Sequence, residues 1–368
     1  MALDLRGLEH KPISLAKKEI RLLEIYTAHD VLEPISSRLA TYKITPELEY
    51  IGLCALLRDE ENPGTEKIWV NGSKVTIPRT VGQALRHVRG LFLSQKAAQA
   101  TAGGGPAWLQ NFVRGFRYLL PDEASRAGRD APLRVWLDCI CIDPRNAAET
   151  ENRRAHVALA YESAKMTIGW LGMKDPTSDL AISTVRELEQ RFPPHFGDPQ
   201  DKIDHPENYS PIMRFLTPFG PTWEADSKVN GSRERGPVFI AVRNFVNRPF
   251  FTRQWILEEL TLSSFPAFLL GDEIISWRQL LVWNRVEGKS CSSLNHAMRM
   301  FVLLRTIKSA DPCLITSVEF EKAGCEGFSK ETFEAIKALP KMDFGVIFTL
   351  LDAFERRRSH AGPRVPWG

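Results

Sequence analysis

Short apolar runs typical of buried strands alternate along this chain with stretches whose apolar residues recur at helical spacing. Nearly unbroken apolar runs cover residues 134–142, 166–171 and 265–270, as expected for strands buried on both faces of a sheet. Helical spacing covers residues 80–92, 149–165, 178–191, 239–247 and about 252–263. This alternation predicts an α/β fold, a mainly parallel sheet with helices on both faces.

Two further elements precede the first of these runs. Residues 48–57 form a short apolar segment of strand character. Residues 68–77 place Asn71-Gly72 between flanks rich in β-branched and aromatic residues, and Asn-Gly is a strong signal for a tight hairpin.

The length of 368 residues allows two domains, or one domain with insertions. Residues 96–106 end in three glycines and a proline, which indicates a flexible joint. Residues 193–237 hold eight prolines and four glycines, which indicates an insertion in the core. We therefore expect an N-terminal lead over residues 1–47, one core domain over 48–275 and a helical C-terminal extension over 276–368.

Charge and composition name no macromolecular partner. The 48 Lys and Arg residues against 45 Asp and Glu residues leave a formal charge of +3, so no nucleic acid is expected as a partner. No apolar run is long enough for a membrane span, and the N-terminus lacks a signal-peptide pattern, which predicts a cytoplasmic protein that does not contact a membrane. Six scattered cysteines predict reduced thiols, and without a second Cys or His pair at ligand spacing we expect no metal site.

Three sequence blocks occur in an informative order. Residues 135–143 read VWLDCICID, residues 157–172 end in IGWLG, and residues 248–260 read RPFFTRQWILEEL. In order and spacing they resemble the fungal heterokaryon-incompatibility (HET) domain, and the resemblance extends over about residues 48–275. HET domains in turn resemble TIR domains, which implies a flavodoxin-like, doubly wound sheet.

Some TIR domains cleave NAD at the bond between nicotinamide and ribose by means of a glutamate on a helix. The resemblance implies that Glu259 is the catalytic residue here, one helical turn after Trp255. NAD would then be a substrate, and no cofactor is required. The nicotinamide leaves as a neutral molecule, so a single carboxylate that stabilises the developing positive charge of the ribose suffices, unlike ordinary glycoside hydrolysis.

The expected ligand pocket lies beyond the carboxyl ends of the strands, as in other open α/β sheets. The candidate binding residues there are Gly52, Cys54, Arg58, Asp138, Asp143, Arg145 and Trp255. Three roles stay open. Trp255 either contacts the ligand or packs in the core, and Asp138 either lines the pocket or pairs with Arg153 or Arg253. Cys54 is also a candidate nucleophile. Cys139 and Cys141 are expected to be small core residues, and His156 to lie on a helix.

Three functions remain open. The first is a NAD glycohydrolase of fungal allorecognition or programmed cell death. The second is a HET scaffold that acts without catalysis, by forming a homo-oligomer or binding a partner. The third is an enzyme of secondary metabolism with another small-molecule substrate. The last two arise because Gly52, Leu53, Ala55 and Leu56 stand where the first HET block usually has Ser, an aromatic residue, Trp and Gly.

Overall fold

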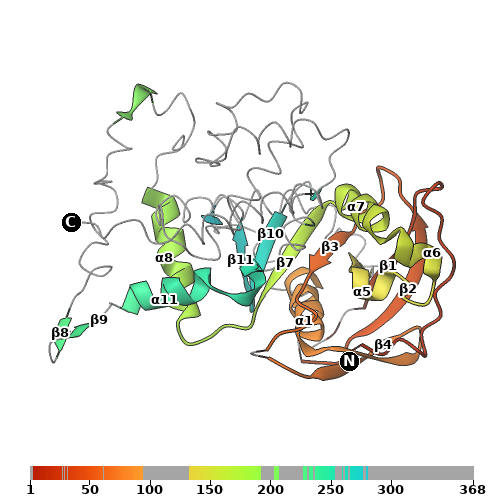
Figure 1. Cartoon of the computed structure of the whole chain (residues 1–368), viewed down its shortest axis with the longest axis horizontal. Coiled ribbons are helices and arrows are strands. Elements are labelled where there is room, and N and C mark those ends of the chain that lie inside the picture. Colours follow the sequence, from red (N-terminus) through yellow and green to blue (C-terminus); the bar gives the residue numbers. More distant parts are fainter. Residues whose placement is uncertain are drawn as a thin grey trace, which may run out of the picture.

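A computed structural model describes residues 3–93, apart from residues 27, 29, 31 and 61, and residues 132–191. It also describes these shorter segments: 203–206, 227–229, 232–234, 237–252, 259, 262–263, 266–276 and 279–280. A nine-stranded sheet with helices against it forms the framework of this part of the chain (Figure 1).

The sheet has the strand order β11-β10-β7-β3-β6-β1-β2-β4-β5. Its strands are β1 (Glu19–Ile25), β2 (Ser36–Lys43), β3 (Ile51–Cys54), β4 (Thr65–Val70), β5 (Ser73–Pro78), β6 (Leu133–Trp136), β7 (Met166–Gly172), β10 (Pro266–Leu270) and β11 (Glu273–Ser276). A separate pair joins β8 (Ser227–Val229) to β9 (Ser232–Glu234). The helices are α1 (Arg79–Leu93), α5 (Asp138–Cys141), α6 (Ala147–Glu151), α7 (Arg153–Ser163), α8 (Ser178–Arg191) and α11 (Pro237–Val246), with a 3-10 turn, η3 (Pro249–Thr252).

The α/β class is confirmed, but the expectation of a mainly parallel sheet is wrong. The central strands β10, β7, β3 and β6 are parallel, whereas β1 pairs antiparallel with both β6 and β2. The antiparallel hairpins β10–β11 and β4–β5 complete the two ends. Residues 19–43, expected to be a lead, add the strands β1 and β2 to the sheet, so the antiparallel pairs come from β1 and from the two hairpins.

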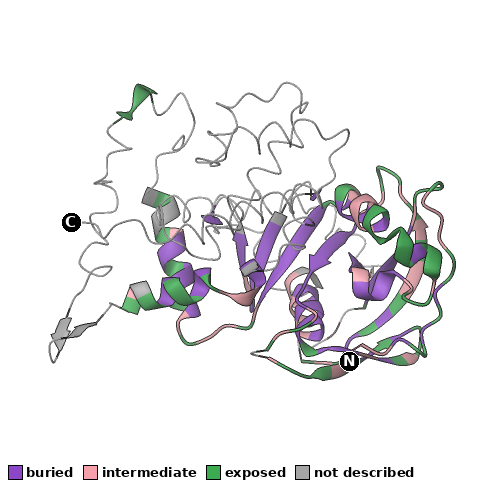
Figure 2. Cartoon of the chain, in the orientation of Figure 1, coloured by how far each residue is buried: buried purple, intermediate pink, exposed green. Residues whose placement is uncertain are grey.

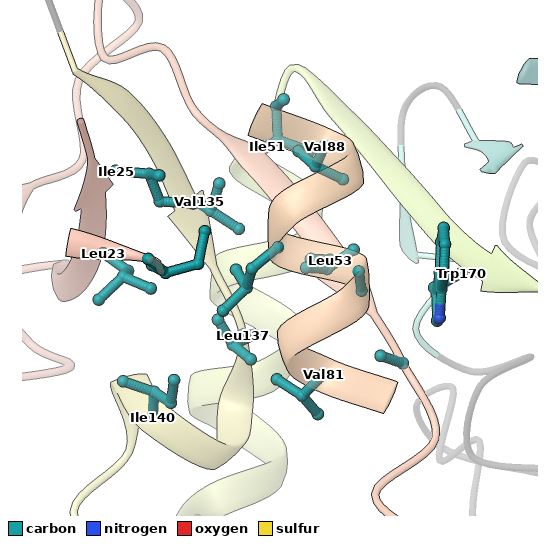
Figure 3. Packing of buried hydrophobic residues seen from close by; sticks show 14 of the residues in the cluster. Leu23, Ile25, Ile51, Leu53, Val81, Val88, Val135, Leu137, Ile140 and Trp170 are labelled. Atoms are coloured by element: carbon teal, nitrogen blue, oxygen red, sulfur yellow. The ribbon is translucent and has the colours of Figure 1, made fainter. Parts of the chain in front are cut away.

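The two faces of the central sheet are covered differently. Alternate residues of the strands, such as Leu53 on β3 and Trp170 on β7, join the apolar cluster that includes α1 residues Val81 and Val88 (Figure 3). The central strands are buried along their length, as Figure 2 shows. Gly52 has the opposite alternation and faces α7, because a Cβ atom there would meet the ring of Tyr161. The side chain of Thr167 lies beside the same position. The cluster described below lies on this second face.

The predicted strand over residues 134–142 is also wrong beyond its first three residues. Strand β6 ends at Trp136, and residues Asp138–Cys141 form the single helical turn α5. Cys139, Ile140 and Cys141 are buried from this turn, so their apolar character comes from burial and not from a strand. Short apolar runs fit either element, and here the backbone turns after Leu137.

The Asn-Gly hairpin is confirmed as β4 and β5. Asn71 and Gly72 adopt φ values of 53° and 77°, and the type I′ turn requires positive φ at both central positions. The expected strands at residues 166–171 and 265–270 are confirmed as β7 and β10.

The expected helix over residues 149–165 is two helices, α6 and α7, which meet at Asn152. The glycine joint at 96–106 and the C-terminal extension beyond residue 280 lie outside the described residues, as does most of the insertion at 193–237.

Candidate functional site

The order in which the chain adds the four parallel strands to the sheet reverses between β3 and β7. In chain order they are β3, β6, β7 and β10, and in the sheet they run β10-β7-β3-β6. The chain therefore steps from β3 to one side and then returns past it to β7. Ligands in open α/β sheets bind beyond the carboxyl ends of the strands at such a switch point. Cys54 is the last residue of β3 and lies at this position.

Tyr161 of α7 lies over the strands at this point. A Cβ atom on Gly52 would lie 2.7 Å from Cδ1 of Tyr161 and 3.0 Å from Oγ1 of Thr167 on β7. The ring also packs edge-on against Trp136, with 4.9 Å between ring centroids. Because residue 52 has no side chain, the aromatic ring of Tyr161 can rest directly on the sheet.

The Tyr161 hydroxyl connects the strand to Glu259. It lies 3.2 Å from the carbonyl oxygen of Leu53 and 3.0 Å from Oε2 of Glu259, so it can donate to either acceptor. The Cys54 thiol also forms a hydrogen bond with the Glu259 carboxyl. These three side chains come from β3, α7 and a helical position 98 residues after Tyr161. We call Cys54, Asp138, Arg153, Tyr161 and Glu259 the switch-point cluster.

Glu259 is only 5% exposed, and burial raises its pKa to about 8. The negative charge of Asp138 adds to this rise, whereas the hydrogen bonds from Cys54 and Tyr161 and the positive charge of Arg153 oppose it. In the described part of the chain, no cationic side chain forms an ion pair with Glu259. A carboxyl group in such surroundings is mostly protonated at neutral pH.

Asp138 begins α5 and forms an ion pair with Arg153 of α7, one of the two partners considered from the sequence. The other, Arg253, lies outside the described residues. The Asp138 side chain is 12% exposed and that of Arg153 is 54% exposed, so this end of the switch-point cluster faces solvent. The two carboxyl groups of the switch-point cluster therefore differ: Asp138 is paired with a cation, whereas Glu259 is buried and has no ion-pair partner among the residues that the structure describes.

Burial raises the pKa of the Cys54 thiol well above its ordinary value, and the neighbouring Glu259 carboxyl adds to the rise. A nucleophilic cysteine needs its thiolate form, and both burial and the Glu259 carboxyl that contacts Cys54 disfavour that form. The structure therefore gives Cys54 the properties of a weak hydrogen-bond donor to Glu259.

Asp143 and Arg145 lie apart from Glu259, in the loop between α5 and α6. Arg145 forms an ion pair with Asp143 at 2.9 Å and donates to the carbonyl oxygen of Leu8. The buried ring of His10 lies between this pair and the carbonyl oxygen of Ile140. These contacts hold the N-terminal segment against the loop that follows Asp138.

The remaining predicted residues divide in two. Arg58 is exposed in the loop after β3, and Trp255 lies outside the described residues. Tyr161 was not identified from the sequence, although this residue lies on the buried face of a predicted helix. The one sequence signal for it is Gly52, whose missing side chain leaves room for a large ring over the strand. His156, expected on a helix, is on α7, but it is buried and its Nδ1 finds no hydrogen-bond partner in the described part.

We expect Gly52→Ala to destabilise the chain by about 1–3 kcal/mol, because the added methyl group overlaps the Tyr161 ring at 2.7 Å. Urea unfolding followed by circular dichroism measures the change. Gly7→Ala is the matched control, since its Cβ would meet its nearest neighbour, Cβ of Ser73, at an ordinary 3.8 Å. Equal stability of the two variants would show that Tyr161 does not rest on Gly52.

No helix in the described part of the chain is long and apolar enough to cross a membrane. No group of three or more His, Cys, Asp or Glu side chains is arranged there to hold a metal ion.

The chain resembles proteins of heterokaryon incompatibility. The profile of the family described as "Heterokaryon incompatibility protein (HET)" matches residues 120–259, a range that includes Asp138 and Tyr161 and ends at Glu259. "Heterokaryon incompatibility protein 6, OR allele" of Neurospora crassa is 22% identical over 276 residues, which cover 71% of this chain and 34% of that protein. The chain thus spans about a third of the length of this relative. No solved structure matches this chain. The predicted resemblance to the HET family is confirmed, and residues 120–259 carry the match to the family.

Proposed function

We propose that this protein acts in fungal allorecognition or programmed cell death, and that its HET domain cleaves NAD between nicotinamide and ribose with the carboxylate of Glu259. The family match and the name of the Neurospora crassa relative support the biological role. One observation carries the chemical role: Glu259 is a buried carboxyl group at the switch point of the sheet, next to the end of β3.

The order of the parallel strands supports a flavodoxin-like arrangement. Numbered along the chain, β6, β3, β7 and β10 lie in the order 2-1-3-4, and in flavodoxin-like folds this order places the ligand between strands 1 and 3. Those strands are β3 and β7, which carry Gly52 and Thr167 beneath Tyr161. A nucleotide bound there would present its ribose to the switch-point cluster.

The burial of Glu259 and its raised pKa also support a functional role. A carboxyl group buried without a cation lowers the stability of a fold, and strongly perturbed carboxyl groups gather at functional sites. In NAD cleavage the ionised form would stabilise the positive charge that develops on the ribose. Because the pKa of Glu259 is about 8, the reaction should speed up as pH rises toward 8 and level off above it.

We expect the purified protein to release nicotinamide from NAD, and Glu259→Gln to slow the release by at least ~100-fold. Chromatography of nicotinamide between pH 6 and 9 measures both the rate and its rise with pH. Glu151→Gln, the same exchange at an exposed position of α6, is the matched control and should leave the rate unchanged. An unchanged rate in Glu259→Gln would remove Glu259 from the reaction.

A second candidate function is a scaffold that acts by self-association without catalysis. It is favoured by the first block, because Leu53, Ala55 and Leu56 are apolar, are at most 7% exposed and offer a ligand no polar side chain. This function predicts no nicotinamide release and a molar mass that grows with protein concentration. Light scattering of the same preparation used with NAD separates the two: a strict monomer that cleaves NAD excludes the scaffold.

A further inference from the structure

Two carboxyl groups in different surroundings belong to the switch-point cluster, and the charge of Asp138 acts on Glu259. Asp138 is held by the guanidinium of Arg153 at the solvent-facing end. Glu259 receives the Tyr161 hydroxyl and the Cys54 thiol and is 5% exposed. A buried carboxyl group without a cation keeps its proton, whereas one paired with arginine loses it. Two carboxyl groups whose surroundings separate their charge states are the arrangement that supplies one acid and one anion.

Cleavage of NAD does not require a proton donor. The nicotinamide ring of NAD is cationic and leaves as a neutral molecule, so cleavage needs an anion and no proton. A nucleoside with an uncharged base differs, because its base departs as an anion unless a ring nitrogen is protonated as the bond breaks. Such a substrate needs a neutral acid beside the base and an anion beside the ribose.

We propose that this site also hydrolyses the N-glycosidic bond of nucleosides with uncharged bases, with Glu259 as the acid and Asp138 as the anion. This inference relies on the proposed ribose site at the switch point, but not on NAD being cleaved there. The Glu259 proton passes to the base as the bond from C1′ to nitrogen breaks. Water adds to C1′ and gives a proton to Asp138, so that nucleoside and water yield ribose and free base. A proton returned from Asp138 through solvent restores Glu259.

The surroundings of Glu259 indicate which group in the switch-point cluster changes its charge near neutral pH. The groups around it are Cys54 of β3, Asp138 of α5, and Arg153 and Tyr161 of α7. Burial raises the pKa of both the Cys54 thiol and the Tyr161 hydroxyl well above their ordinary values, so both stay uncharged. Among the described members of the switch-point cluster, we therefore assign the charge that changes near neutral pH to Glu259.

The test compares two ribosides that differ in the charge of the base, adenosine and nicotinamide riboside. With adenosine we expect adenine release to be fastest near pH 6 and to fall about tenfold per pH unit above pH 8, because the acid form is lost. Nicotinamide riboside should show the opposite trend, like NAD. Chromatography of the free base from pH 6 to 9 measures both.

Two variants assign the roles. Glu259→Gln removes the proton donor and should slow adenine release by at least ~100-fold. Asp138→Asn should slow it by a similar factor, and it leaves unpaired only Arg153, whose side chain is 54% exposed, so this variant is expected to fold. Glu151→Gln should have no effect. Thermal unfolding of each variant confirms that a slow variant is folded.

The outcomes are distinct. Adenine release that is absent at pH 6, rises with pH, or is unchanged in Glu259→Gln overturns this inference even if NAD is cleaved. Adenine release without nicotinamide release from NAD supports it and overturns NAD as the substrate. If the folded protein releases neither base, both proposals fall.

Discussion

Glu259→Gln is expected to stabilise the folded protein by about 3 kcal/mol at pH 7 and to have almost no effect at pH 4. The unfolded chain loses the Glu259 proton near pH 4.5, whereas the folded chain keeps it until about pH 8. Rising pH therefore destabilises the fold between these values, by about 1.4 kcal/mol per pH unit. Glutamine has nearly the shape of the protonated glutamate and does not titrate, so it removes this cost.

Urea unfolding of both proteins at pH 4, 5.5, 7 and 8 measures the difference in the free energy of unfolding. The gap between variant and parent should widen as pH rises and stop widening near pH 8. Glu151→Gln, at an exposed position, should show no such trend. Parallel pH profiles for parent and Glu259→Gln would mean that Glu259 is ionised in the folded protein, and the acid role proposed for it would then be untenable.

The expected gain in the stability of Glu259→Gln also distinguishes the candidate functions. A variant that is more stable but inactive would show that Glu259 lowers stability for the sake of chemistry. A variant that is more stable and fully functional in heterokaryon incompatibility would instead favour the scaffold. Stability and activity measured on the same substitution therefore separate the two candidate functions.

How far the sequence predicted the fold depended on whether a segment's partners lie nearby. The hairpin of β4 and β5 followed from Asn71-Gly72, because the turn itself fixes the pairing. Strand β7 followed from its continuous apolar run. Strand β1 was missed although it is almost wholly buried, because Arg21 and Glu24 interrupt its apolar pattern. Their partners, Glu149 and Arg38, lie on other elements.

The site shows the same dependence. Resemblance to the HET domain pointed to Glu259, and the strand-end rule pointed to Cys54 and Asp138. The protonation of Glu259 could not be predicted, because it follows from burial and from contacts with side chains 98 or more residues away. Asp143 and Arg145 lie at the predicted sheet edge, but they bind the N-terminal segment, whose position the sequence did not reveal.

The buried ion pair between Arg21 of β1 and Glu149 of α6 is expected to be the most sensitive point of the fold outside the switch-point cluster. Two hydrogen bonds of 2.8 and 2.7 Å join the side chains, which are 1% and 4% exposed. Arg21 also donates to the carbonyl oxygen of Cys141, and Glu149 accepts from the backbone N–H of Asp143. The pair therefore fixes both ends of the turn that follows α5 and, with it, the position of Asp138.

Burial alone would raise the pKa of Glu149, but the hydrogen bonds from Arg21 lower it overall below its ordinary value. Both groups are thus charged, and removal of either leaves a buried charge without its partner. We expect Arg21→Met and Glu149→Gln each to lower the free energy of unfolding by about 3–5 kcal/mol. Urea unfolding at pH 7 measures each loss.

The double variant Arg21→Met/Glu149→Gln should lose less than the sum of the two single losses, because it leaves no unpaired charge. Arg6→Met is the matched control, since it breaks an ion pair with Asp4 whose side chains are 90% and 42% exposed, and it should change stability little. If the two single losses add in the double variant, the pair is not coupled. If the two losses do not add, and if each single variant also slows base release, then β1 positions Asp138 for the reaction. It does so through the turn after α5, which Arg21 holds.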